Sequence, residues 1–202
     1  MIANSQVPAR DASWVVVDTP LDRAALGAFC GDIERLFRIN PYLEIEAWRH
    51  NGDDRHYVKF RNLSNGQTVE LELRIERDSP NQFSVAYDRG IKARTCFTME
   101  ETAGGNRLTI TDDYSRLADA ERAQHLDEVD KSLNAWGWAL HEYLRQERRW
   151  GRYSAWRWYM RRCWLPMTPR SRRITYMLVV LTVAELALIL LGALIYWIEF
   201  AD

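Results

Sequence analysis

The acidic and hydroxyl side chains that first suggest a chemical site are Asp112 and Tyr114. They follow Leu108 and Ile110 at two-residue steps, and residues so spaced in a β-strand share one face. Tyr87 closes another alternating apolar run in the same way. A polar group on an apolar face needs a partner or a ligand, so we expect these three to bind a polar part of a ligand or to act as acid or base.

Arg49 belongs to the same set by a similar argument. Leu43, Ile45 and Ala47 alternate with polar neighbours, and the next step of that alternation directs Arg49 inward. A pair between Arg49 and Asp112, or contact of either with a ligand head group, would offset the cost of burying a charge. Solvated charges at the rim of the sheet are the alternative.

Other catalytic and metal-binding patterns are weak. His50 and His56 flank a turn, whereas His125 and His141 lie sixteen residues apart, too far for a metal pair on one helical face. Nucleophile-elbow, phosphate-loop and dinucleotide motifs are not present. The chain has three cysteines, Cys30, Cys96 and Cys163. Their odd number and lack of a paired spacing indicate neither a disulfide framework nor a zinc site. We expect no metal and no cofactor, and favour a binding protein over an enzyme.

The elements that would position these residues follow from the periodicity. Ser13–Thr19 is a β-branched run typical of a strand, and Asp22–Phe37 reads as a helix in two pieces with Gly31 between them. From Leu43 to Ile110 the apolar residues alternate, which predicts six antiparallel strands. Turn signals separate the strands, among them Asn51-Gly52, Asn65-Gly66, Ser79-Pro80-Asn81, Arg89-Gly90 and Gly104-Gly105.

A long amphipathic helix follows, from Asp119 to about Arg149. Its apolar residues recur at steps of three and four, and they are Leu126, Val129, Leu133, Trp136, Leu140 and Leu144. A sheet that is wet on one side needs a cover, which this helix supplies. The predicted fold class is therefore α+β, with an antiparallel sheet wrapped on a long helix.

This order of elements resembles the START-like or SRPBCC superfamily, the helix-grip domains that include polyketide cyclase/dehydrase-like proteins. The resemblance covers about residues 12–148 and is carried by Cys30–Trp48, CGDIERLFRINPYLEIEAW, and by the long helix. It implies an apolar cavity between sheet and helix for a lipid, sterol, quinone, polyketide or similar molecule. The superfamily includes both binders and enzymes. Its carbon-monoxide-dehydrogenase-type members similarly join such a domain to a C-terminal membrane helix.

The residues that would line this cavity are those the alternation turns inward, together with one face of the helix. The predicted ligand-binding set is Arg49, Val58, Phe60, Leu71, Leu73, Val85, Tyr87, Phe97, Met99, Ile110, Asp112, Tyr114, Leu133, Trp136 and Leu140. For the apolar members, ordinary core packing is the alternative.

The C-terminal segment predicts a membrane anchor. Residues 174–198 form an apolar run with Glu185 as its one ionisable group. At about 1.5 Å per residue a helix of this length spans roughly 37 Å, enough to cross a hydrocarbon layer of about 30 Å with some tilt.

Arginines on one side of this run indicate its orientation. Residues 144–173 contain ten arginines and one acid, and residues 199–202 contain no Lys or Arg. The chain therefore carries +6 over residues 144–202 and −7 over residues 1–143. By the positive-inside rule we expect a single-pass protein of an inner (cytoplasmic) membrane with its N-terminal domain in the cytoplasm. Basic residues beside a membrane helix argue against nucleic acid as a partner.

The neck between domain and anchor, residues 149–173, interleaves aromatic rings with arginines. Such a composition suits the headgroup zone of a bilayer, so we expect contact with membrane lipids. The predicted membrane-interface residues are Arg149, Trp150, Arg152, Tyr153, Trp156, Arg157, Trp158, Arg161, Arg162 and Trp164.

Glu185, Gly192 and Tyr196 fall on one face of the predicted membrane helix. A carboxyl near the middle of a span usually faces a protein partner or a functional path, and a small residue beside it favours close helix contact. We weigh a membrane-protein partner or a homo-oligomer against a lone anchor whose Glu185 is protonated.

These observations divide the chain into an N-terminal tail (1–11), a START-like domain (12–148), the neck (149–173), the membrane helix (174–198) and a C-terminal tail (199–202). The opening residues show no secretory signal. The expected function is membrane-anchored binding or transfer of a hydrophobic small molecule. The alternatives are a cyclase or dehydratase acting on a lipophilic substrate, and an accessory subunit of a membrane complex.

Overall fold

The computed structural model describes residues 12–116 and 119–200, and in this part of the chain seven strands, five α-helices and one short π-helix follow one another in an α+β order. Of residues 119–131 the backbone alone is described. The predicted tails, 1–11 and the end of 199–202, and the side chains of Leu126 and Val129 lie outside the described residues. The strands are β1 (Ala12–Thr19), β2 (Leu43–His50), β3 (Arg55–Asn62), β4 (Thr68–Ser79), β5 (Gln82–Tyr87), β6 (Arg94–Thr102) and β7 (Gly105–Asp113). The helices are α1 (Arg23–Cys30), α2 (Ile33–Arg38), α3 (Asp119–Trp150), α4 (Ser154–Tyr159), the π-helix η1 (Met160–Trp164) and α5 (Pro169–Phe200).

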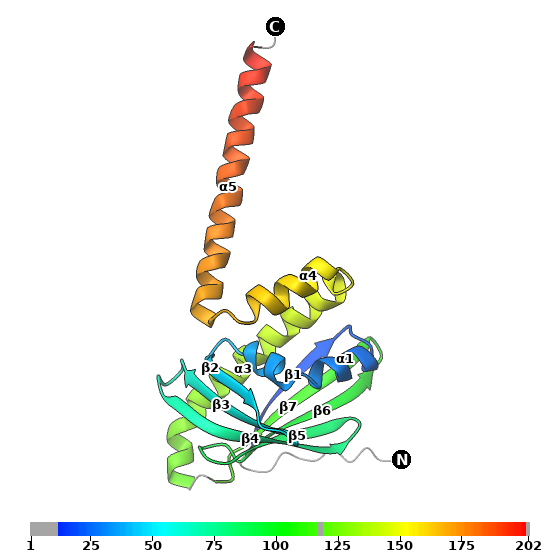
Figure 1. Cartoon of the computed structure of the whole chain (residues 1–202), viewed down its shortest axis with the longest axis vertical. Helices are drawn as coiled ribbons and strands as arrows, with labels where there is room; N and C mark the ends of the chain where they lie inside the picture. The colour runs from blue at the N-terminus through cyan, green and yellow to red at the C-terminus, as the bar shows by residue number, and fades with distance from the viewer. Residues whose placement is uncertain (1–11, 117–118, 201–202) are drawn as a thin grey trace.

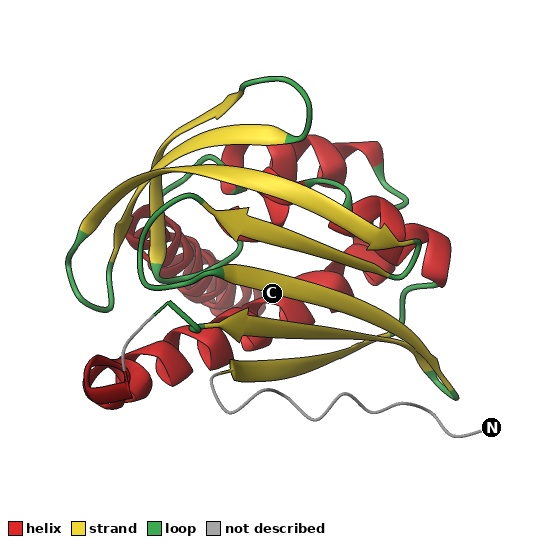
Figure 2. Cartoon of the chain, turned by 90° about the horizontal axis from the view of Figure 1, so that it is seen from below, coloured by secondary structure: helices red, strands yellow, loops and turns green. Residues whose placement is uncertain are grey.

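The strands form a single antiparallel sheet in the order β1-β7-β6-β5-β4-β3-β2. Strands β2 to β7 make a meander, and β1, the first strand of the chain, pairs with β7 at the edge of the sheet. Figure 2 shows the curved sheet with the helices packed on one of its faces. The end of β1 comes close to the start of β7 at Gly105, where φ is 149° and an added Cβ would lie 2.3 Å from the Thr19 carbonyl oxygen. The predicted six-strand meander and the extra first strand are confirmed.

The two short helices begin at aspartate caps. Asp22 accepts a hydrogen bond from the Ala25 amide (2.8 Å), and Asp32 accepts one from the Arg35 amide (3.1 Å). Gly31 separates the helices, as the sequence predicts. Their buried residues, from Leu26 to Phe37, join the sheet in one apolar core.

Helix α3 lies along the concave face of the sheet and closes the core. Leu133, Trp136, Leu140 and Leu144 are each at most 3% exposed, in the predicted stripe. The Trp136 indole donates to the Leu36 carbonyl (3.0 Å), which fixes α3 against α2. Contact with β1 is close at Gly137, because an added Cβ there would lie 2.4 Å from a Val15 methyl.

Strand β2 departs from simple alternation. A register shift between Ile45 and Ala47 inserts a bulge opposite β3. After the bulge, Trp48 turns inward and packs on Phe37 with ring centroids 5.9 Å apart. The predicted inward orientation of Arg49 is therefore wrong: its side chain is exposed, and its guanidinium lies 5.7 Å from the Tyr57 ring on the outer face.

The C-terminal segment folds back before it leaves the domain. Helix α4 and η1 run across the end of α3, with Met160 and Leu165 buried in the core. The chain then turns at Pro166–Thr168, and α5 stands clear of the domain (Figure 1). Its large apolar side chains are exposed along its length. Within the described residues, α5 is the helix long and apolar enough to cross a membrane.

Candidate functional site: a cavity between sheet and helix

A cavity of about 170 Å³ opens between α2, the sheet and α3. Its apolar wall is made by Phe37, Leu43, Phe60, Val69, Leu71 and Trp136. Two hairpin loops form its rim, the β3–β4 turn and the β5–β6 turn. The remaining lining residues are polar or lie in those loops: Asn40, Asn62, Ser64, Asn65, Gln67, Tyr87, Arg89, Gly90, Ile91, Lys92, Tyr114 and Ser132.

The structure brings five of the predicted ligand-binding residues to this cavity: Phe60, Leu71, Tyr87, Tyr114 and Trp136. Their role in binding stays a prediction. The other apolar members pack in the core without lining the cavity, and these are Val58, Leu73, Val85, Phe97, Ile110, Leu133 and Leu140. Met99 lies at the opposite end of the sheet, beside α1.

An aromatic cluster explains why the hollow is shorter than the alternation suggests. Phe97 stacks on Phe83 with centroids 4.7 Å apart, and Trp136 meets Phe97 edge-on at 5.9 Å. Phe37 packs against Trp136 at 5.2 Å. These rings fill the centre of the domain and separate the cavity at the two loops from a second hollow near Met99 and α1.

Asp112 lies behind the cavity, not in it. The side chain is completely buried and accepts hydrogen bonds from Thr95 (2.6 Å to Oδ1), Tyr114 (3.1 Å to Oδ2) and the Lys92 ammonium. A buried carboxylate with an ion pair and two hydroxyl donors has its charge compensated. The Arg49–Asp112 pair, one of the two alternatives drawn from the sequence, does not form: Asp112 pairs with Lys92, and Arg49 is exposed.

The Tyr87 hydroxyl of this network is a poor base. Burial, followed by the nearby Asp112 charge, raises the pKa of Tyr87 well above its usual range, so its hydroxyl stays protonated at neutral pH. That hydroxyl is 2.8 Å from Thr95 Oγ1, and Tyr114 hydrogen-bonds Asp112. With Asp112 enclosed and Tyr87 protonated, the arrangement suits hydrogen bonding to a ligand better than proton abstraction.

Lys92 and the polar residues of the loops are functional candidates that sequence reasoning missed. The pattern at Arg89-Gly90 and Asn65-Gly66 identified turns, but alternation assigns faces only within strands. It therefore gives no direction for a loop side chain such as Lys92. The one available signal was an unpaired buried Asp112, which required a cation from elsewhere in the fold.

The neck separates into exposed and packed residues. Eight of the ten predicted membrane-interface residues are exposed, namely Arg149, Trp150, Arg152, Tyr153, Arg157, Trp158, Arg161 and Arg162. Trp156 and Trp164 instead pack against the core. Trp164 lies between Tyr143, with ring centroids 5.9 Å apart, and the guanidinium of Arg172, 4.1 Å from the Trp164 ring centroid.

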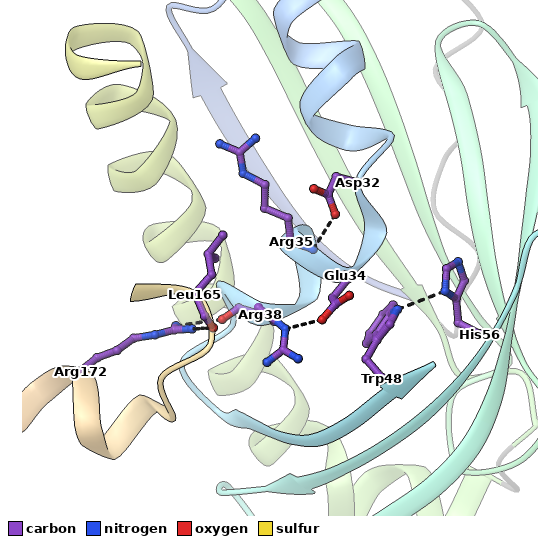
Figure 3. A network of polar contacts seen from close by, with 8 residues as sticks. All are labelled: Asp32, Glu34, Arg35, Arg38, Trp48, His56, Leu165 and Arg172. Carbon is purple, nitrogen blue, oxygen red and sulfur yellow. Dashed lines mark hydrogen bonds and ion pairs between the residues drawn. The ribbon is translucent and has the colours of Figure 1, made fainter. Parts of the chain in front are cut away.

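Arg172 fastens the start of α5 to the domain. Its guanidinium donates to the Arg38 carbonyl (2.8 Å), the Leu165 carbonyl (2.8 Å) and the Trp164 carbonyl (3.0 Å). These oxygens end α2 and η1, where helix carbonyls lack helical partners and a cation is favourable. Figure 3 shows Arg172 reaching Arg38 and Leu165 from the foot of α5. The foot of α5 is thereby held beside the α2–β2 corner.

The predicted contact face of α5 is exposed. Glu185, Gly192 and Tyr196 lie in the solvent-exposed part of the helix, and nothing lies within 4 Å of a Cβ placed on Gly192. Among the described residues, no group of three or more His, Cys, Asp or Glu side chains could hold a metal ion.

The sequence matches no protein-family model and no curated protein. Solved structures nevertheless share the fold. A protein from Nitrosomonas europaea superposes with a TM-score of 0.52 and 12% identity, over 71% of this chain and all of that one. Protein Ms6760 from Mycobacterium smegmatis superposes with a TM-score of 0.51 and 16% identity, over 66% of this chain and 90% of that one. A START superfamily protein from Mycobacterium smegmatis superposes with a TM-score of 0.50 and 13% identity, over 66% of this chain and 94% of that one. The domain thus has the START-like helix-grip fold, with a long apolar helix added at its C-terminal end.

Proposed function

We propose that this chain is a membrane-tethered module that binds or transfers a hydrophobic small molecule. The observation that carries the proposal is the cavity of about 170 Å³, walled by aromatic and aliphatic side chains under α3. Concave, mostly apolar sites with a few polar groups are the usual form of small-molecule sites. The START-like fold supports this assignment and leaves the reaction, if any, open.

The tether follows from the C-terminal segment. Helix α5 exposes its apolar side chains to solvent from Ile174 to Phe200, and such a surface is stable only in lipid or against a partner. The exposed rings of Trp150, Tyr153 and Trp158 suit the headgroup zone, and the exposed arginines suit anionic lipids. By the positive-inside rule the domain lies in the cytoplasm, against an inner membrane.

The cavity rim and the anchor share one corner of the domain. Arg172 binds the carbonyl of Arg38, and Asn40, two residues further, lines the cavity. The next turn continues to the rim, because the Leu63 amide of the β3–β4 hairpin donates to the Tyr42 carbonyl (2.8 Å). Figure 1 shows α2 and the start of β2 beneath the foot of α5. In the proposed function, this geometry keeps one side of the opening close to the bilayer.

A cavity-filling substitution tests the proposal. Val69 lines the cavity from β4, whereas its neighbour Thr68 is exposed and does not. We expect the full chain, purified in mild detergent and examined by native mass spectrometry and extraction, to retain a small apolar molecule. Val69→Trp should lose it and Thr68→Trp, the matched control, should keep it.

The melting temperature of each variant shows whether the fold is intact. Repeated preparations of the original chain without a bound molecule would contradict the proposal. So would equal retention by Val69→Trp when its fold is intact.

A further inference from the structure

The cavity volume limits what can be enclosed. An apolar cavity of about 150 Å³ holds one benzene molecule in a known case, so about 170 Å³ has room for one ring with a small substituent. Phe37, Phe60 and Trp136 provide the faces against which a ring can pack. A sterol or a whole lipid chain is too large to be enclosed, and part of it would have to extend out of the cavity through the opening between the two loops.

The protons of the buried network are committed inside the protein. Thr95 gives its only hydroxyl proton to Asp112, so Tyr87 is the donor in the bond that Tyr87 and Thr95 share. Tyr114 donates to Asp112 as well. These hydroxyl groups therefore direct their protons away from a ligand.

Among the described residues, Lys92 is the charged donor of the cavity wall next to this network, and its pair with Asp112 leaves it with further N–H groups. An ammonium has three N–H groups, of which Asp112 accepts one, and the Lys92 side chain lines the cavity with 27% of its surface exposed. The polar group of a ligand at this wall should consequently be a hydrogen-bond acceptor. A cationic group is disfavoured, because it would face the ammonium.

The charge of the acceptor follows from Asp112. A ligand carboxylate would compete with Asp112 for Lys92 and place a second negative charge beside a fully buried one. A neutral oxygen can take a spare N–H of Lys92 while the Asp112 pair stays intact. Arg89, at the rim, is exposed and already paired with Asp88 (3.0 Å), so it compensates an anion weakly.

Resting on the proposed function, we infer that this cavity takes a ring-sized apolar group bearing a neutral oxygen, a hydroxyl or a carbonyl, which accepts a hydrogen bond from Lys92. Any longer apolar tail on that ring lies outside the cavity. The inference assigns Lys92 as the residue that selects the polar end of the ligand.

Three probes with one ring and one ethyl group separate the possibilities: 4-ethylphenol, ethylbenzene and 4-ethylbenzoate. At neutral pH the phenol is uncharged and the benzoate is ionised. Binding is measured by calorimetry on the full chain in lipid nanodiscs, with empty nanodiscs subtracted for partition into lipid. We expect 4-ethylphenol to bind about tenfold more tightly than ethylbenzene, the worth of one hydrogen bond to a charged donor, and 4-ethylbenzoate to bind more weakly than the phenol.

Two variants assign the preference to Lys92. Lys92→Met combined with Asp112→Asn removes the donor without stranding a buried charge, and should reduce the phenol preference to within about twofold. Arg94→Met removes a nearby cation that pairs with Asp113 outside the cavity and should leave the preference unchanged.

The outcomes distinguish this inference from the proposed function. Equal binding of phenol and ethylbenzene, or tighter binding of the benzoate, overturns the inference and leaves a hydrophobic binding site. Failure of all three probes to bind overturns both. A phenol preference that survives in the folded double variant removes Lys92 from the assignment and refutes it.

Discussion

Arg172 gives the sharpest prediction, because this one side chain hydrogen-bonds the foot of α5 to the end of α2 and to the residues that end η1. Replacing it with alanine removes the side-chain donor from the carbonyls of Arg38, Trp164 and Leu165 and the cation from the Trp164 ring; the Trp164 carbonyl keeps the Met167 amide as a donor. A hydrogen bond to a charged group contributes about 1.5–3 kcal/mol, and a cation over a ring adds about 0.5–2 kcal/mol. Water replaces part of this in the variant, so we take a net loss of about 3 kcal/mol.

The loss should be local. The buried residues of the sheet, α1 and α3 do not depend on Arg172, so the domain should fold while η1 and the foot of α5 detach from α2. At about 1.4 kcal/mol per tenfold, 3 kcal/mol increases the population of the opened state roughly 100-fold. Amide hydrogen exchange on the full chain in nanodiscs should therefore become about 100-fold faster across residues 160–168, with little change in β4 to β7.

Two further variants make this result specific. Arg172→Lys keeps the charge but lacks the planar guanidinium that reaches three carbonyls. Its exchange rate across residues 160–168 should therefore fall between those of the original chain and Arg172→Ala. Arg170→Ala removes an exposed arginine from the same turn and should leave exchange unchanged. Unchanged protection in Arg172→Ala, or equal loss in Arg170→Ala, would refute the role given to Arg172.

Other predictions concern stability and association. Gly137→Ala should lower the free energy of unfolding by about 1–3 kcal/mol in urea denaturation, because the new methyl meets Val15, whereas Gly104→Ala should be nearly neutral; equal effects would contradict the close packing of α3 on β1. Burial, followed by the charge of His50, lowers the pKa of His56, and His56 Nδ1 accepts the Trp48 indole proton (3.1 Å), which a protonated ring cannot do. The stability from neutral His56 is complete above its unfolded pKa of about 6.5 and is lost as pH falls below that value, so unfolding midpoints should drop from pH 7.5 to 5.5, and less so in His56→Gln. An unchanged pH slope in that variant would count against this account. If α5 associates through its polar face, Glu185→Leu should abolish cross-linked dimers or a co-purified partner in membranes, and equal association in that variant would leave Glu185 without this role.

The order of the elements was predictable because periodicity and turn residues report on them directly. The switch from helical spacing before Asn40 to alternation after Leu43, with Asn-Gly turns, suffices for the meander, and the stripe through Leu133 and Leu140 suffices for α3. The orientation of Arg49 was not predictable in this way. A one-residue bulge reverses the face of every later residue in β2, and its cause lies in packing between Trp48 and Phe37, not in local sequence.

The site was harder to predict than the fold, since it depends on contacts between distant segments. Phe60, Leu71 and Trp136 follow from alternation and helix periodicity, but so do Phe97 and Ile110, which only fill the core. The sequence pattern predicts which face of the sheet or helix a residue lies on. Whether that residue lines the cavity or packs in the core depends on its position along the sheet. Likewise, Arg172 resembles the other neck arginines in sequence, and only the fold brings it to the carbonyls that end α2 and η1.

If the proposed function holds, the size of the cavity and the position of α5 favour one mode of ligand transfer. A space of about 170 Å³ encloses a ring and leaves a long tail outside, where exposure to water costs about 0.8 kcal/mol per methylene. A tail of ten methylenes would lose about 8 kcal/mol in solvent, more than the enclosed ring regains. If the rim stays at the bilayer, as the Arg38–Tyr42 corner beneath α5 allows, the tail remains in lipid and the cost does not arise. In the proposed function the tether is therefore part of the binding site, and release of the domain from the membrane should weaken binding of long-tailed ligands while short probes bind as before.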